Sequence, residues 1–243
     1  MKILVTGSRG ILGEQVVTRA MNLRHSVLST NRDSLDVSNR EQINAVVKFF
    51  KPNAIINCAG VLPGGETIDM IKTNSLGPNL LAATGVRLVH MSTDCVFSGR
   101  SSGFHRSNQT PDPDTAYGRT KLAGESQLPN VLNVRGSFID RNGGLIRWLR
   151  QQQGEIDGWG AAFWNGMNSF QMADTLVNFA DGTRTGVVHV ASEGFTTKYD
   201  LLVRAAELLE VPVTVKLVLQ PRIDRTLAPD ISIGLLDNLW KSL

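Results

Sequence analysis

Two side chains that could move a proton lie one helical turn apart in the middle of the chain. Tyr117 and Lys121 are four residues apart in a segment that reads as a helix, so both side chains lie on one face of it. A tyrosine hydroxyl has an ordinary pKa of about 10, and a neighbouring ammonium lowers that pKa by favouring the phenolate. The spacing therefore predicts an acid/base pair.

A hydroxyl upstream completes this constellation. Ser92 and Thr93 end an apolar run that reads as a strand, and α/β sheets place their ligand crevice at the carboxyl ends of their strands. A hydroxyl at that point can hydrogen-bond a carbonyl oxygen. A tyrosine and a lysine at this spacing occur by chance, so the prediction depends on the strand-end hydroxyl and on a second motif near the N-terminus.

That second motif is a glycine-rich turn. Gly7, Gly10 and Gly13 follow a short apolar strand and open a helix, which is the context of a dinucleotide-binding site. The first glycine permits the tight turn, the second lets the backbone approach a pyrophosphate, and the third lets the helix pack on the strand. The helix N-terminus adds free N–H groups and partial positive charge. The alternative is a glycine turn without a ligand, and the flanking strand and helix favour the dinucleotide.

Basic residues favour NADP(H) over NAD(H). An NAD site often has an acid at the end of the second strand, whereas this strand is followed by Asn31 and Arg32. Arg32 and Arg9 could meet a 2′-phosphate, since a guanidinium matches phosphate geometry, or they could be solvated surface residues. Asp36, followed by Val37, either accepts from the adenine amino group or caps a turn.

Short strands and helices alternate along the chain and predict an α/β fold. A capping box formed by Ser38 and Glu41 is expected to open one of the helices, which ends before Pro52. No clear pattern follows Val213. Strands are predicted at residues 2–6, 25–30, 54–58, 87–92, 131–136 and 186–191, and helices at 11–23, 67–84, 117–127 and 197–209.

This alternation predicts βαβ units and a Rossmann-type, doubly wound parallel sheet with a small C-terminal substrate-binding lobe. Residues 1–140, with a strand at 186–192, are expected to form the dinucleotide-binding domain. Residues 141–185 and 193–243 are expected to form the reduced lobe.

Several motifs carry a resemblance that covers nearly the whole chain. Besides the glycine turn, they are NCAG at 57–60, Asn74, STDCVFSG at 92–99, YGRTK at 117–121, VRGS at 134–137 and FWNG at 163–166. With them the chain resembles the extended short-chain dehydrogenase/reductases, and most of all the dTDP-4-dehydrorhamnose reductase group. That group reduces the C4 keto group of nucleotide-linked 4-keto-6-deoxy sugars in deoxysugar and polysaccharide biosynthesis.

The resemblance implies a role for each matching residue. Tyr117 would protonate the C4 oxygen as hydride arrives from the nicotinamide, Lys121 would lower the pKa of Tyr117 and bind the nicotinamide ribose, and Thr93 would polarise the carbonyl. The implied cofactor-binding residues are Gly7, Ser8, Arg9, Gly10, Ile11, Leu12, Gly13, Asn31, Arg32, Asp36, Val37, Cys58, Ala59, Gly60, Asn74, Ser92, Tyr117, Lys121 and Ser137. The implied substrate residues are Asp94, Cys95, Phe138, Trp164 and Arg225.

Three functions other than simple reduction are compatible with parts of this pattern. Related dehydratases read Thr-Asp-Glu where this chain reads Thr93, Asp94 and Cys95, so the missing carboxylate disfavours dehydration. Epimerase-reductases resemble the chain and use a cysteine at the position of Cys95, but they need a further His or Lys. Between Lys121 and Lys198 the chain has no lysine and only His189, on a predicted strand, so this partner is expected to be missing. A small, partly buried thiol is the simpler interpretation of Cys95. The third alternative is a regulatory subunit that binds NADP without turnover.

The aromatic residues of the expected lobe leave further alternatives open. Trp148 is predicted to lie in the core, whereas Trp159, Phe163 and Trp164 either stack on a sugar or base or pack in the core. Arg135 and Arg225 either reach a substrate diphosphate or form surface salt bridges.

Composition excludes several classes of protein. The 243 residues are 42% hydrophobic with a net charge of +3 and no cluster of basic residues, so no nucleic-acid partner is expected. No apolar run reaches the roughly 20 residues of a membrane span, and the run after Lys2 is not a secretory signal. Two cysteines and scattered histidines predict neither a disulfide framework nor a metal site. The composition therefore predicts a cytoplasmic protein, and the resemblance implies a nucleotide-sugar substrate and a monomer or a homodimer.

Overall fold

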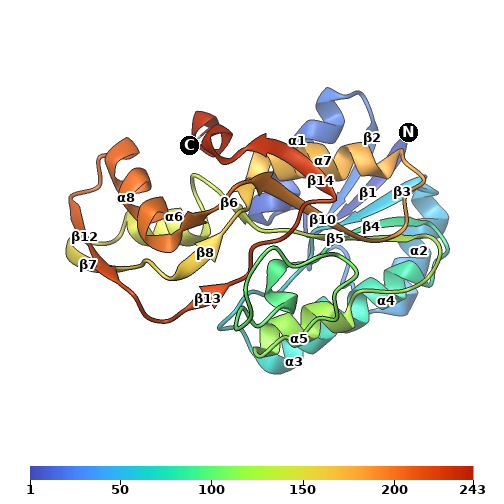
Figure 1. Ribbon diagram of the computed structural model, residues 1–243. Helices are drawn as coiled ribbons and strands as arrows, with labels where there is room; N and C mark the ends of the chain where they lie inside the picture. Colours follow the sequence, from blue (N-terminus) through green and yellow to red (C-terminus); the bar gives the residue numbers. More distant parts are fainter. Residues whose placement is uncertain (243) are drawn as a thin grey trace.

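A seven-stranded parallel sheet forms the body of the molecule, and a smaller lobe lies beside it (Figure 1). The computed structural model describes residues 1–242. The strand order is β14-β10-β5-β4-β3-β1-β2, and every neighbouring pair is parallel. The fold confirms the predicted Rossmann-type α/β class. The strands are β1 Lys2–Thr6, β2 Ser26–Thr30, β3 Ala54–Asn57, β4 Arg87–Met91, β5 Val131–Arg135, β10 Gly186–Glu193 and β14 Ile231–Leu235.

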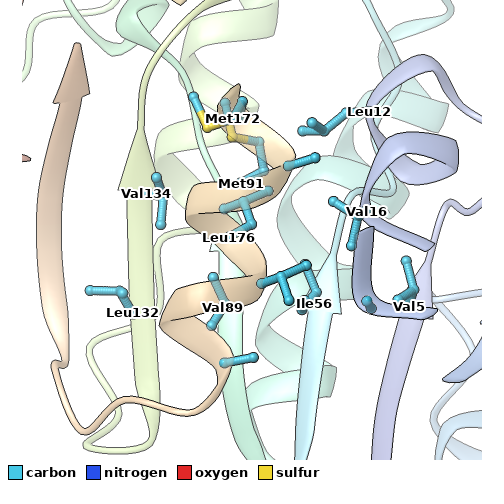
Figure 2. Packing of buried hydrophobic residues seen from close by; sticks show 14 of the residues in the cluster. Val5, Leu12, Val16, Ile56, Val89, Met91, Leu132, Val134, Met172 and Leu176 are labelled. Carbon is cyan, nitrogen blue, oxygen red and sulfur yellow. The ribbon is translucent and has the colours of Figure 1, made fainter. Parts of the chain in front are cut away.

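The central strands bury both of their faces, with alternate residues going to opposite sides. On one side α1 (Ile11–Asn22) and α7 (Ser169–Ala180) pack on the sheet, and Figure 2 shows Val16, Leu176 and Met172 of these helices meeting Val5, Ile56 and Val89 of the strands. The other side is covered by α2 (Arg40–Phe50), α4 (Gly77–Ala82) and α5 (Ala116–Ala123). Each fully buried Leu, Ile or Val contributes about 1.5–3 kcal/mol, so these two layers dominate the stability of the body.

The helix expected at 67–84 is present but is not regular. It runs as α3 (Thr67–Met70), a π-helical segment η1 (Ile71–Leu76) and α4. Pro78 has no N–H to donate to the carbonyl four residues back, that of Asn74. The backbone of α5 comes close there, because a Cβ on Gly124 would lie 2.0 Å from the Asn74 oxygen. The helix is therefore irregular just before Gly77 and Pro78, where the π-helical segment ends.

Two local predictions need correction. The capping box of Ser38 and Glu41 does not form: Asn39 caps α2 by accepting from the N–H groups of Glu41 and Gln42, and Ser38 donates to Asp36 instead. The helix expected at 117–127 is shorter, because α5 ends at Ala123 before Gly124.

The lobe has its own core, formed by Ile146, Leu149, Ile156, Leu201 and Leu202 among other buried residues. The stretch after Val213, where no pattern was expected, contains β12 and β13 and then returns to the main sheet as β14. The elements of the lobe are β6 Phe138–Ile139, α6 Gly144–Leu149, β7 Gly154–Trp159, β8 Ala162–Trp164, β9 Met167–Asn168, β11 Thr196–Thr197, α8 Lys198–Leu208, β12 Val213–Val218 and β13 Ile223–Asp224; a 3-10 helix at Leu236–Ser242 follows β14.

The structure differs from the expected division of the chain in two places. The α7 helix, expected in the lobe, packs on α1 and the sheet, because it is the crossover that leads into β10 and must cover the sheet. The β14 strand, also expected in the lobe, extends the main sheet beside β10. Within residues 1–242, no helix is long and apolar enough to cross a membrane.

Candidate active site

The glycine turn lies at the carboxyl end of β1. Gly7 has φ +70°, and a Cβ there would lie 2.5 Å from the backbone nitrogen of Ala59. A Cβ on Gly13 would lie 2.1 Å from the Gly7 oxygen, so α1 packs directly against the turn. A Cβ on Gly10 would meet only the Gly7 oxygen, at 3.3 Å, and this exposed position leaves the backbone open to a ligand. The steric roles expected of the three glycines fit this geometry.

A cleft of about 470 Å³ opens beside the turn. Its far wall comes from α3 and η1, which contribute Asp69, Lys72 and Thr73, none of them expected from the sequence. No linear motif marks these three residues; only the folded chain brings them to the glycine turn. The expected cofactor residues that line the cleft are Gly7, Arg9, Gly10, Asn31, Arg32, Asp36, Val37, Cys58, Ala59 and Gly60.

The two arginines at the mouth of the cleft form ion pairs with nearby aspartates. Arg9 lies 3.1 Å from Asp33 and Arg32 lies 3.5 Å from Asp69, and both arginines are largely exposed. Exposed ion pairs of this kind contribute about 0–1 kcal/mol, so a bound phosphate can displace the carboxylates at little cost. Asp36 accepts from the N–H and hydroxyl of Ser38, and these hydrogen bonds lower its pKa. Asp36 thus caps a turn, one of its two expected roles.

Several residues expected to bind the cofactor do not line the cleft, and their side chains contact other parts of the protein instead. The side chain of Asn74 bonds the N–H and the carbonyl of Val61, at 2.8 and 2.9 Å, and so fixes a loop of the cleft. The hydroxyl of Ser92 donates to Glu125, and that of Ser137 accepts from Trp164. Leu12 is buried in the core. Ser8 and Ile11 are half-buried beside the turn, outside the residues that line the cleft.

The tyrosine, the lysine and the threonine meet where β4 ends. Thr115 caps α5 by accepting from the N–H of Gly118, and a Cβ on Gly118 would lie 2.1 Å from the Cys95 oxygen. The first turn of α5 is therefore packed against the segment that carries Thr93, and a Thr93 hydrogen bond reaches Tyr117. Lys121 is buried and donates to the Met91 carbonyl over 2.6 Å.

The pKa values of this pair are set mainly by burial. Burial raises the pKa of Tyr117, the nearby Cys95 and Asp94 raise it further, and the Thr93 hydrogen bond opposes them. Tyr117 is therefore a neutral phenol at neutral pH, the form that donates a proton. Burial also lowers the pKa of Lys121 to about 8, against the charge of Glu125, which raises it. The ammonium expected to govern Tyr117 is thus itself weakened by desolvation.

The pKa of Lys121 predicts a pH dependence of stability. The folded protein releases this proton at about pH 8, whereas a lysine in the unfolded chain holds it to about pH 10.4. Between these values the unfolded state binds more protons, so the contribution of Lys121 to the free energy of unfolding rises with pH. Urea unfolding at pH 7–10.5 should show this rise relative to a Lys121→Met variant. Parallel profiles for the two proteins would contradict it.

A charged cluster lies next to Tyr117. The Arg225 guanidinium donates to the Phe97 carbonyl over 2.8 Å and lies 3.7 Å from the Cys95 sulfur. Lys198 at the start of α8 is close enough to Asp94 and Cys95 for their charges to raise its pKa against burial, which lowers it. The gap without lysines between Lys121 and Lys198 therefore does not leave Cys95 without a neighbouring lysine, because the fold brings Lys198 to it. Burial and Asp94 raise the pKa of Cys95 to about 12, so it is a thiol.

The structure shows whether most of the aromatic and basic residues discussed above are buried or exposed, and so whether they could contact a substrate. Trp164 is only 4% exposed, bonds Ser137 and lies under the Lys198 ammonium at 5.2 Å, so it offers almost no surface for stacking. Trp148 is 41% exposed, which corrects its assignment to the core. Arg135 is buried against Glu125 and cannot reach a diphosphate. Phe138 is half-buried against the main core. Among the described residues, no group of three His, Cys, Asp or Glu could hold a metal ion.

Known proteins with related sequences are reductases of nucleotide sugars. Residues 1–141 match the family model described as the RmlD substrate binding domain. The dTDP-4-keto-6-deoxy-D-glucose reductase of Streptomyces niveus is 34% identical over 221 residues, which cover 82% of this chain and 75% of that protein. The dTDP-4-dehydrorhamnose reductase of Mycolicibacterium smegmatis is 27% identical, with 82% and 66% covered.

Solved structures agree in fold over the whole chain. The crystal structure of a dTDP-4-dehydrorhamnose reductase from Clostridium acetobutylicum superposes with a TM-score of 0.89 at 25% identity and covers 100% of this chain and 98% of that one. The dTDP-4-dehydrorhamnose reductase of Bacillus anthracis in complex with NADP gives 0.87 at 20% identity, with 98% of each chain covered. This chain therefore shares its fold with both solved structures, in the sheet body and in the lobe.

Proposed function

The chain belongs to the RmlD substrate binding domain family, and from that premise we propose that it is an NADPH-dependent reductase of a nucleotide-linked 4-keto-6-deoxy sugar. The observation that carries the proposal is the neutral phenol of Tyr117, held beside the Thr93 hydroxyl at the strand end. These residues do not line the dinucleotide cleft themselves, but Lys121 of the same helix interacts electrostatically with Cys58, which does. A keto group bound at this strand end would lie beside both a proton donor, Tyr117, and a hydroxyl that can hydrogen-bond its oxygen, that of Thr93.

The cleft fits a dinucleotide because a Cβ at Gly7 or Gly13 would collide with backbone, while Gly10 is exposed toward the opening. NADPH bound in it would supply the hydride. Thr93 would orient the C4 keto oxygen, and Tyr117 would donate its proton to that oxygen as negative charge develops. Lys121, anchored on the Met91 carbonyl, would stabilise the tyrosinate that remains. A positioned general acid of this kind contributes about 10²–10⁴-fold to the rate.

The direct test is turnover. Purified protein is incubated with NADPH and a panel of nucleotide-linked 4-keto-6-deoxy sugars, and loss of the absorbance of reduced nicotinamide is followed. Oxidation with one member of the panel supports the reductase and names its sugar. Tight NADPH binding without oxidation by any member would contradict the reductase and favour the regulatory-subunit alternative, for which a pull-down of a partner protein is the next experiment.

Dehydration and epimerisation fit this site less well. Asp94 is followed by Cys95, so the second carboxylate of a dehydratase is absent from the sequence. Cys95 has a pKa of about 12, which makes it a poor base for removing a proton beside the keto group, even with Lys198 close by. Reduction in deuterated water should therefore leave C3 and C5 unlabelled, in wild type and in Cys95→Ser. Solvent deuterium at either carbon would identify an epimerase-reductase.

Cofactor preference gives a further prediction. Replacing Arg32 by Asp puts a carboxylate at the mouth of the cleft beside Asp69, where we propose that the 2′-phosphate binds. We expect the NADPH-to-NADH ratio of kcat/KM to fall at least about tenfold, since a charge-assisted contact is lost and repulsion replaces it. Arg24→Asp, an exposed change away from the cleft, is the matched control. A ratio that is unchanged in Arg32→Asp would assign the phosphate elsewhere.

The site of action and the assembly remain predictions. Both cysteines are free thiols, as a reducing cytoplasm would require. Ile68, Ile71 and Leu76 are exposed along α3 and η1, and such a face would suit a homodimer.

A further inference from the structure

We propose that Arg225 is a positioning residue for the proton donor: its guanidinium links the two segments that hold Tyr117 and so fixes where the phenol lies. The reaction in this inference rests on the proposed function, whereas the contacts do not. The sequence left Arg225 open between a contact with a substrate diphosphate and a surface salt bridge. Its contacts in the folded chain give it a third role.

The guanidinium of Arg225 contacts three different groups of the protein. Its Nε donates to the Phe97 carbonyl over 2.8 Å. Its Nη2 lies 3.4 Å from Oδ1 of Asp114, and its Nη1 lies 3.7 Å from the Cys95 sulfur. The side chain is only 20% exposed. Because a planar guanidinium has five N–H donors in a fixed fork, it can hold several acceptors at once, and here each of its nitrogens faces one.

These contacts lie on both sides of Tyr117. Asp114 directly precedes Thr115, the N-cap of α5, and Tyr117 is in the first turn of that helix. On the other side, Cys95 lies near enough to Tyr117 to raise its pKa, and the charge of Arg225 in turn lowers the pKa of Cys95. The guanidinium therefore joins the start of the helix that carries the phenol to the segment that packs against it.

The backbone around Arg225 is fixed to the loop that follows Gly99. The Asp224 carboxylate accepts from the N–H of Gly103, and the Thr226 hydroxyl accepts from the N–H of the next residue in the loop, both over 2.8 Å. A Cβ on Gly103 would lie 2.0 Å from an oxygen of each of them, so both side chains lie on the loop side. Successive side chains of an extended segment point to opposite sides, which directs Arg225 away from this loop and toward Cys95.

A buried amide holds the same segment just after Arg225. Asn165 is 3% exposed, and its Oδ1 accepts from the N–H of Leu227 over 3.0 Å while its Nδ2 donates to the Leu227 carbonyl over 2.8 Å. Arg225 thus projects from backbone that is anchored on both sides. A side chain supported in this way can hold its neighbours in one geometry, which is what a catalytic group needs.

The first test observes the phenol directly and does not depend on turnover. The chain has two tyrosines, Tyr117 and Tyr199, so protein labelled with ¹³C at the tyrosine Cζ gives two NMR signals, which the two Tyr→Phe variants assign. We expect Arg225→Gln to shift or broaden the Tyr117 signal beyond its wild-type linewidth and to leave the Tyr199 signal unchanged. Arg100→Gln is the matched control and should change neither signal. Its guanidinium also pairs with Asp114, at 3.5 Å, but is 79% exposed.

Kinetics separates positioning from substrate binding. We expect Arg225→Gln to lower kcat for keto reduction about 10–100-fold, since a displacement of about 1 Å at a reacting group can cost 10²-fold. KM for the sugar and the Kd of dTDP, UDP and GDP should stay within about twofold of wild type. Arg225→Lys keeps the charge, but one ammonium cannot hold both Phe97 and Asp114, so its kcat should fall at least about tenfold as well. A diphosphate contact would instead raise KM, and Lys would restore part of it, because an ammonium also binds phosphate.

The outcomes for Tyr117 and for the reductase are distinguishable. The positioning role is overturned if the Tyr117 signal is unchanged in Arg225→Gln, if KM rises while kcat is unchanged, or if Arg100→Gln has the same effects. If Arg225→Gln does not fold, Arg225→Lys is used for both measurements. A Tyr117 signal that depends on Arg225, in a protein that oxidises NADPH with no keto sugar, would support the positioning role and reject the reductase. Full kcat in Arg225→Gln would support the reductase and overturn the positioning role.

Discussion

Tyr117→Phe is expected to lower kcat for keto reduction by about 10²–10⁴-fold while NADPH binds as before. The variant removes only the hydroxyl and keeps the aromatic ring. Without the phenol the site loses the proton donor that we propose for the C4 oxygen, and the Thr93 hydroxyl beside it supplies only a hydrogen bond. Single-turnover decay of NADPH absorbance, with substrate saturating, measures the effect on chemistry alone.

Tyr199→Phe provides the matched control, because Tyr199 is the second of the two tyrosines in the chain and lies on α8. We expect its kcat to stay within about twofold of wild type, because Tyr199 is half-buried against Gly158 of β7 and its hydroxyl has no part in the proposed proton transfer. If Tyr117→Phe kept more than a tenth of the wild-type kcat, another group or a water molecule would be the acid. The assignment of Tyr117 would then be wrong, whatever the fate of the reductase proposal.

The sequence was informative where spacing within one element decides the geometry. The glycine turn needs close packing between residues 7 and 13, and Tyr117 and Lys121 need one turn of α5, so both could be predicted from local patterns. The parallel sheet followed from the alternation of strands and helices, which is also a local signal. The main exception was the cap of α2, where Asn39 rather than Ser38 accepts from the first N–H groups.

Contacts between distant segments could not be predicted in the same way. Lys198 comes near Cys95 from more than a hundred residues away, and Lys72 lines the same cleft as the glycine turn although it lies on another helix. The β14 strand was missed because its alternating, half-exposed residues give a weak pattern at the edge of the sheet. The direction of the pKa shift of Tyr117 was missed for a related reason: the sequence shows a lysine one helical turn away, but it does not show the burial and the neighbouring Cys95 and Asp94 that raise this pKa.

A buried ion pair behind the site is the second place where one substitution should have a large effect. Glu125 lies just after α5 and accepts from both Nε and Nη2 of Arg135, at 2.8 and 2.7 Å. Its Oε1 also accepts from the hydroxyl of Ser92 over 2.6 Å, at the end of β4. One carboxylate thus ties α5, β4 and β5 together, and these elements carry Tyr117 and Thr93. Both partners of the ion pair are almost fully buried, so neither can turn to water if the other is removed.

Glu125→Ala should therefore lower the free energy of unfolding by about 3–5 kcal/mol, because it leaves the Arg135 charge buried and unpaired. For a domain of this size that loss corresponds to a fall in Tm of roughly 6–20 °C. Urea and thermal unfolding measure it, with Glu207→Ala as the control, since Glu207 pairs with Arg204 at the surface and its loss should cost less than about 1 kcal/mol. Equal losses in the two variants would mean that the buried pair contributes no more than the exposed one.

In a Glu125→Ala, Arg135→Met double variant the uncompensated charge is gone, so we expect stability to return toward wild type while the Ser92 hydroxyl loses its acceptor. If activity stayed low in that double variant after stability had returned, Glu125 would act by positioning the end of β4 for Thr93, and not only by holding the fold together.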